Sequence, residues 1–137
     1  MVKLIMGLKG MGKTKMLIDM VNEAAKNDKG DVVCIEKGKK LTYDISHDVR
    51  LIDVTEYEIS DFNSFYGFIC GILAQDYDIS AIFIDSVLKI CSDDFNAFSA
   101  FLTKIEKLSE EQGKEIILTA SGDQAIAPES VKRFFAA

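Results

Sequence analysis

The sequence has no tryptophan, one proline and one histidine among its 137 residues, and its three cysteines are widely separated. Cys34, Cys70 and Cys91 form no C-x-x-C pair. This spacing predicts neither a disulfide framework nor a zinc site, and it indicates buried free thiols in a reducing compartment. A catalytic cysteine would need His47, the only histidine, as its base, and we expect His47 to be a loop residue instead.

Long apolar runs and an excess of positive charge are also absent. No stretch approaches the roughly 18 apolar residues of a membrane helix, and the N-terminus lacks the zones of a signal peptide. We therefore expect a cytoplasmic protein with no membrane partner. The net charge of -6 argues against a nucleic-acid partner bound through its phosphates. The densest basic run, Lys37, Lys39 and Lys40, is expected to be a solvated loop.

Apolar runs that end at glycine or polar residues predict several strands. The stronger runs lie at residues 2–6, 31–35, 81–84 and 115–120, and weaker strand signals lie at 41–45 and 50–54. Between them, apolar residues at helical spacing predict helices that begin near Lys13, Phe62 and Phe95. Strands and helices that alternate in this way form parallel βαβ units. We therefore predict one α/β domain over residues 1–137, with a mostly parallel sheet in a three-layer α/β/α fold.

Two further details follow from the helical segments. The aromatic stripe of Phe62, Phe65 and Phe68 is interpreted as core packing rather than as a ligand site. Pro128, the only proline, is expected to open a short terminal helix, where its missing N–H costs nothing.

The segment after the first predicted strand matches G-x-x-x-x-G-K-[ST], the pattern of a phosphate-binding P-loop. Its residues are Gly7, Leu8, Lys9, Gly10, Met11, Gly12, Lys13 and Thr14. The pattern requires a strand before it and a helix after it, and hydrophobic periodicity predicts both. The glycines allow a tight turn whose N–H groups face phosphate oxygens, beside the positive end of the helix. We expect a bound nucleoside triphosphate, with Lys13 on its β and γ phosphates and Thr14 on Mg²⁺.

A second ligand for this magnesium ion is predicted from Asp85. The run Ile82-Phe83-Ile84-Asp85 resembles a Walker B strand, in which apolar residues deliver a carboxylate to the metal through a bound water. Its place after a P-loop in the chain favours this interpretation. The expected cofactor is Mg²⁺ with ATP, held at Thr14 and Asp85.

Hydrolysis needs a carboxylate that orients and activates water, and many P-loop ATPases place a glutamate directly after the Walker B aspartate. Ser86 occupies that position here. Glu36 is the alternative base, because it ends the second predicted strand at the edge where open α/β folds bind ligands. A solvent-facing turn explains Glu36 equally well. Thr119 and Ser121 end the last strand at the same edge and are candidates for sensing the γ phosphate, although strand-end polarity also explains them.

With the loop, Glu36, Asp85 and Thr119 considered together, the chain resembles the RecA-like branch of P-loop NTPases over most of its length. The strand Val33-Cys34-Ile35-Glu36 resembles the one that carries the catalytic glutamate of PilT-type pilus-retraction ATPases, which implies that Glu36 is the base. The histidine box and Gly-Glu pair of those motors have no counterpart here, so the resemblance implies an ATP-binding core rather than a pilus motor. The fifth strand expected beside the P-loop strand is also missing, which predicts an open edge for dimerisation.

A weaker resemblance is to the core of type II thymidine kinases. It rests on Met6-Gly7 at the start of the loop, Ser46-His47 after the second strand and Ile84-Asp85 before the next helix. Those enzymes also carry a glutamate after the aspartate and a zinc lasso, and this sequence has neither.

We predict a small P-loop NTPase that binds ATP and magnesium and hydrolyses ATP slowly, with Lys13, Asp85 and Glu36 as catalytic residues. Two alternatives stay open: a nucleotide-binding regulatory module without hydrolysis, and a thymidine-kinase-like phosphotransferase. Arg50 and Arg133 are the only arginines, so an arginine finger must be one of them, from this chain or from a second subunit of a homo-oligomer.

Overall fold

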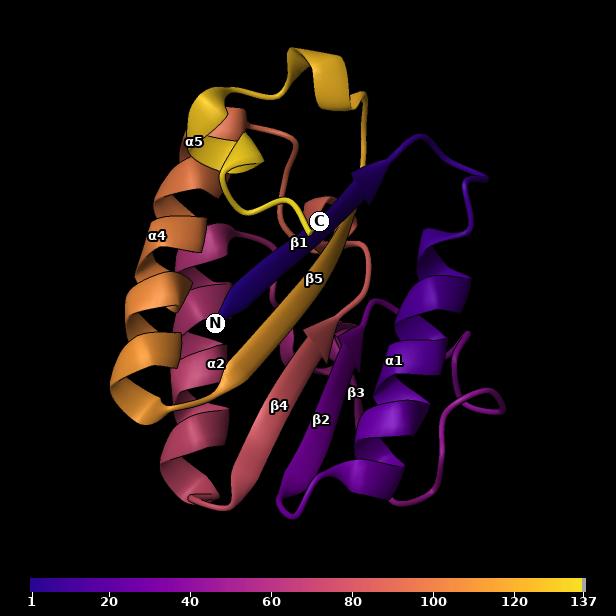
Figure 1. Ribbon diagram of the computed structural model, residues 1–137. Helices are drawn as coiled ribbons and strands as arrows, with labels where there is room; N and C mark the ends of the chain where they lie inside the picture. Colours follow the sequence, from indigo (N-terminus) through magenta and orange to yellow (C-terminus); the bar gives the residue numbers. More distant parts are fainter. Residues whose placement is uncertain (137) are drawn as a thin grey trace.

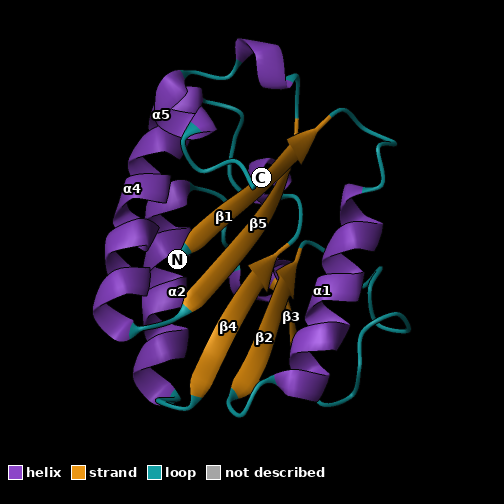
Figure 2. Cartoon of the chain, viewed as in Figure 1, coloured by secondary structure: helices purple, strands orange, loops and turns teal. Residues whose placement is uncertain are grey.

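Five apolar segments form one sheet in which every pairing is parallel. The computed structural model describes residues 1–136. In space the strand order is β1 (Val2–Gly7), β5 (Glu115–Ser121), β4 (Ile79–Ile84), β2 (Asp31–Glu36) and β3 (Arg50–Asp53). All arrowheads in Figure 2 therefore point to the same end of the sheet. The segments that follow the strands meet at this one edge.

Helices cover both faces of the sheet (Figure 1), consistent with the predicted three-layer arrangement. On one face lies α1 (Lys13–Asn27), whose Leu17 and Val21 are buried against the sheet. On the other lie α2 (Phe62–Gln75) and α4 (Phe95–Gln112). A strand covered on both faces must be apolar on both, which is why β2 and β4 are nearly continuous apolar runs.

Aromatic side chains join α2 to α4. The rings of Phe62 and Phe98 lie 5.7 Å apart, and those of Phe65 and Phe101 are also 5.7 Å apart. These separations are typical of favourable aromatic pairs. The prediction that the aromatic stripe packs in the core is therefore confirmed for Phe62 and Phe65, which are buried, and Phe68 packs against the same cluster.

The strong strand predictions are confirmed, and so is the weaker one at residues 50–54. The strand signal at residues 41–45 was wrong, because these residues form turns. Leu41 and Ile45 are buried in the same apolar cluster as Leu17 and Val32. Their apolar character thus reflects a loop that packs beside α1 rather than a strand that pairs in the sheet.

The remaining elements are short. They are α3 (Val87–Ile90), α5 (Glu129–Lys132) and two 3₁₀ helices, η1 (Val54–Tyr57) and η2 (Gln124–Ile126). Pro128 directly precedes α5 as its N-cap, so the predicted terminal helix is confirmed. Across residues 1–136, no helix combines the length and apolar character that crossing a membrane requires.

The edge of β1 is not open in the way we expected. Leu4 N–H donates to the carbonyl of Phe134 at 2.8 Å, and Ala136 N–H donates to the carbonyl of Leu4 at 2.9 Å. The C-terminal segment thus lies beside β1, in the place where we expected a further strand to be missing. Because these bonds satisfy part of the edge, they make it a poorer template for dimerisation.

Gly30 lies in the turn between α1 and β2. A substitution there tests how tightly this turn packs against the start of β4. A Cβ added there would lie 2.3 Å from the carbonyl oxygen of Asp78 and 2.9 Å from the Cβ of Ser80. We expect Gly30→Ala to lower the free energy of unfolding by about 1–3 kcal/mol, since the backbone must shift. Gly67→Ala on α2 is the matched control: a Cβ there meets nothing within 4 Å. It should raise stability by about 0.5–1 kcal/mol. Urea unfolding measures both changes, and a neutral Gly30→Ala would contradict the packing.

Candidate functional site

The loop between β1 and α1 turns through two glycines in a left-handed backbone conformation. Gly10 has a φ of 87° and Gly12 a φ of 82°. Residues with a Cβ rarely adopt these values, so the turn requires glycine at both positions. The chain leaves β1 at Gly7 and enters α1 at Lys13, as the P-loop pattern predicts.

This loop presents unbonded hydrogen-bond donors. The backbone N–H groups of Gly12, Lys13 and Thr14 donate to no acceptor within residues 1–136. Gly12 is the N-cap of α1 and has no side chain to bond them, and the first turn contains no acidic residue. The Lys13 ammonium folds back over the loop and donates to the carbonyl of Leu8 at 3.0 Å. Free N–H groups at the start of a long helix, beside a positive charge, favour an anion.

Oxygen-bearing side chains meet beside this loop. Thr14 Oγ1 lies 3.2 Å from Asp85 Oδ1 and 3.4 Å from Asp85 Oδ2. Thr119 Oγ1 donates to Asp85 Oδ1 at 2.8 Å and accepts the backbone N–H of Ser86, also at 2.8 Å. The structure therefore brings together Thr14 and Asp85, which we predicted as a pair from separate motifs.

Strand order explains why Thr119 reaches Asp85. Strand β5 lies between β1 and β4, and its register places Leu118 beside Ile84. Asp85 follows Ile84 and Thr119 follows Leu118, so these two residues are also neighbours. Thr119 is buried, and its hydroxyl is bonded on both sides. These contacts orient the Asp85 carboxylate, and sensing of the γ phosphate by Thr119 stays a prediction.

Ser86, at the position where many ATPases carry a glutamate, has a φ of 57°. This left-handed conformation is uncommon for a residue with a Cβ and often marks functional sites. Here it accompanies the bond from the Ser86 N–H to Thr119. Ser121, the other polar residue at the end of β5, lies beside Gly7 in the sheet.

Glu36 shares a cavity of about 440 Å³ with Thr14 and Asp85. It is only 3% exposed. Its carboxylate accepts the backbone N–H groups of Lys40 at 3.1 Å and of Leu41 at 3.2 Å. It is therefore not the solvent-facing turn residue of the alternative interpretation. It holds the loop after β2 and also lies at the candidate site.

The surroundings of Glu36 change its affinity for protons. Burial raises its pKa most, and the nearby charges of Asp85 and Asp53 raise it further, whereas the N–H groups of Leu41 and Lys40 lower it. The net direction is upward. A raised pKa keeps more of Glu36 in its neutral form as the pH falls. The neutral acid is a poorer acceptor for a proton from water than the carboxylate is.

The other predicted candidates lie elsewhere. Arg133 binds the carboxylate of Glu106 at 3.0 Å, and neither Arg133 nor Arg50 lines the cavity at Thr14. Burial raises the pKa of the Cys34 thiol to about 12, so it stays protonated and is a poor nucleophile. His47 lies in an exposed turn, as expected.

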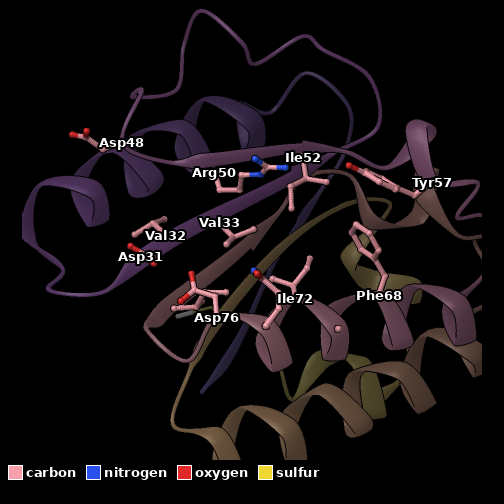
Figure 3. Close-up of a pocket in the computed structure, with 13 residues that line it drawn as sticks. Asp31, Val32, Val33, Asp48, Arg50, Ile52, Tyr57, Phe68, Ile72 and Asp76 are labelled. Carbon is pink, nitrogen blue, oxygen red and sulfur yellow. The ribbon is translucent and has the colours of Figure 1, made fainter.

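A larger cavity of about 640 Å³ lies between β2, β3 and α2. In Figure 3, Arg50 and Ile52 line it from β3, while Phe68 and Ile72 line it from α2. It contains no residue of the P-loop pattern, and neither Glu36 nor Asp85 lines it. It is therefore separate from the candidate site.

Models of known protein families and the sequences of curated proteins contain no match to this chain. The interpretation of the site therefore rests on its residues and their geometry.

Three lysines of the 440 Å³ cavity were missed as site residues. Lys37 and Lys40 belong to the run that we expected to be a solvated loop, and they are exposed as expected, while Lys89 lies on α3. The only signal in the sequence is their spacing: Lys37 and Lys40 come one and four residues after Glu36, and Lys89 comes four residues after Asp85. Two strand ends that carry a carboxylate, each followed closely by lysine, indicate a mixed-charge site at the edge of a parallel sheet.

Thr119 gives a direct test of the hydroxyl network. Thr119→Val keeps the side chain's shape but leaves the Ser86 N–H without a partner and removes one of the two hydroxyl groups that bond Asp85 Oδ1. We expect the free energy of unfolding to fall by about 1–3 kcal/mol, the cost of unsatisfied buried groups. Thr103→Val, at an exposed position of α4, is the matched control and should stay within about 0.5 kcal/mol of wild type. Chemical denaturation measures both, and equal stabilities would refute the network.

Proposed function

We propose that the chain binds a nucleoside triphosphate with magnesium, ATP being the expected nucleotide. The observation that carries the proposal is the 3.2 Å approach of Thr14 Oγ1 to Asp85 Oδ1, directly beside a loop with unbonded N–H groups. The residues from Gly7 to Thr14 would hold the phosphates, with Lys13 supplying a positive charge. A phosphate group matches the donors of the loop, and a divalent cation matches the adjacent oxygens.

The oxygen ligands at this position suit magnesium. Mg²⁺ usually takes one or two protein oxygens and completes its shell with phosphate and water. Among residues 1–136, no three His, Cys, Asp or Glu side chains gather into a metal site. A metal bound at Thr14 and Asp85 would therefore share its coordination with the nucleotide. When bound, it would neutralise charge on the phosphates.

The fold supports the RecA-like interpretation, which stays part of this proposal together with its PilT-type variant. The parallel sheet brings Glu36, Asp85 and Thr119 to the edge where the loop lies. These are the residues on which the resemblance rests.

Slow hydrolysis of ATP is the first candidate activity, with Glu36 as base. It is supported by the cavity that Glu36 shares with Thr14 and Asp85. A regulatory module that binds nucleotide without turnover is the second candidate. It is favoured by the two backbone N–H groups that already bind the Glu36 carboxylate. The two candidates differ in turnover and not in nucleotide binding.

Removal of the loop lysine tests nucleotide binding. We expect Lys13→Ala to weaken the binding of a non-hydrolysable ATP analogue with Mg²⁺ by about 10- to 150-fold, the effect of losing a hydrogen bond between charged groups. Lys15→Ala is the matched control, because Lys15 is exposed and pairs with Asp19. Titration with a fluorescent analogue measures both affinities. Equal affinities of the two variants, or no binding by wild type, would overturn the proposal.

Phosphate release separates the two candidate activities. If Glu36 is the base, Glu36→Gln should slow release by about 10²- to 10⁴-fold while the analogue still binds. Glu56→Gln, at an exposed residue that pairs with Lys39, should release phosphate at the wild-type rate. Tight nucleotide binding without release by wild type would refute hydrolysis and leave the regulatory module. Circular dichroism of each variant establishes that it is folded.

A further inference from the structure

The cavity beside the P-loop gathers lysines in a protein whose net charge is -6. Lys37, Lys40 and Lys89 line it together with Glu36 and Asp85. Among the loop residues only Thr14 lines this cavity, and Lys13 does not. The metal proposed at Thr14 and Asp85 would therefore lie at this cavity, whereas its lysines come from the loop after β2 and from α3.

The two carboxylates of the cavity already accept hydrogen bonds, whereas its lysines have no acidic partner within residues 1–136. Glu36 accepts two backbone N–H groups, and Asp85 is bonded by Thr14 and Thr119. Within residues 1–136, none of the three lysines forms an ion pair. Lys37 Nζ donates only to the carbonyl of Lys89, at 3.2 Å, which joins the two sides of the cavity.

The loop that carries two of these lysines is held in place. Gly38 N–H donates to Asp53 Oδ1 at 2.8 Å, and Gly38 has a φ of 107°. The N–H groups of Lys40 and Leu41 donate to Glu36. Buried Glu36 therefore acts as a positioning residue that sets where Lys37 and Lys40 stand. A loop anchored by two carboxylates keeps its ammonium groups at the cavity at a lower cost in entropy.

We propose that Lys37, Lys40 and Lys89 form an anion subsite that holds the phosphate group of a small second ligand beside the bound nucleotide. This inference rests on the nucleotide binding proposed above. The nucleotide's own phosphates are matched by the loop N–H groups, Lys13 and the metal, so three more lysines exceed what that triphosphate needs. A volume of about 440 Å³ suits a small molecule. The acidic surface of the chain disfavours a nucleic-acid ligand.

Equilibrium dialysis with radiolabelled inorganic phosphate tests the subsite on the full chain saturated with Mg²⁺ and a non-hydrolysable ATP analogue. The analogue keeps phosphate out of the P-loop, and sodium chloride holds the ionic strength constant. The test variant is Lys40→Ala with Lys89→Ala. The control is Lys39→Ala with Lys107→Ala, which removes the same charge from lysines that pair with Glu56 and Glu111 outside the cavity.

We expect wild type and the control to bind one phosphate with affinities within about twofold of each other, and the test variant to bind it at least about tenfold more weakly. Analogue binding without phosphate uptake by wild type would overturn the subsite and leave the proposed function intact. Equal losses in both double variants would also overturn it, since overall charge would then explain the uptake. Failure of wild type to bind the analogue would refute the proposed function, and the subsite with it.

Discussion

In-register parallel pairing of β1, β5 and β4 is the constraint on which the candidate site depends. The pairing sets Gly7 beside Ser121 and Ile84 beside Leu118. Because the strands run the same way, the residues that follow them emerge at one edge. The loop, Asp85 and Thr119 are far apart in the sequence, and the pairing of the strands brings them together. A slip of one residue in β5 would turn Thr119 to the other face and separate it from Asp85.

At this edge, neutral donors bond both the buried Glu36 carboxylate and the partly buried Asp85 carboxylate. Backbone N–H groups bind Glu36, and hydroxyl groups bind Asp85. Buried carboxylates without such partners would be costly. Since these acids do not need the lysines, the positive charges of Lys37, Lys40 and Lys89 stay available at the cavity. The cavity thus combines two hydrogen-bonded carboxylates with three lysines that form no ion pair within residues 1–136.

The sequence predicted the loop and the strands correctly where a single physical requirement acts on a short segment. Gly10, Gly12, Lys13 and Thr14 lie in a pattern whose spacing the loop itself demands, and the apolar strands had to be buried on both faces. It was misleading at residues 41–45, where apolar side chains pack a loop beside α1. It also left the role of Glu36 open, because its bonds to Lys40 and Leu41 depend on how the loop folds back. Contacts between β4 and β5 depend on strand order, which no local pattern contains.

Ser86 shows how this site differs from that of an ATPase with a glutamate after the Walker B aspartate. Its left-handed backbone, with a φ of 57°, costs about 1 kcal/mol or more in a residue with a Cβ. The conformation directs the Ser86 N–H to Thr119, which in turn holds Asp85. The strain at this position thus serves the orientation of a candidate metal ligand instead of the placement of a base. Since Glu36 is also engaged by its own loop, these contacts fit the proposal that a bound nucleotide would be held rather than rapidly cleaved.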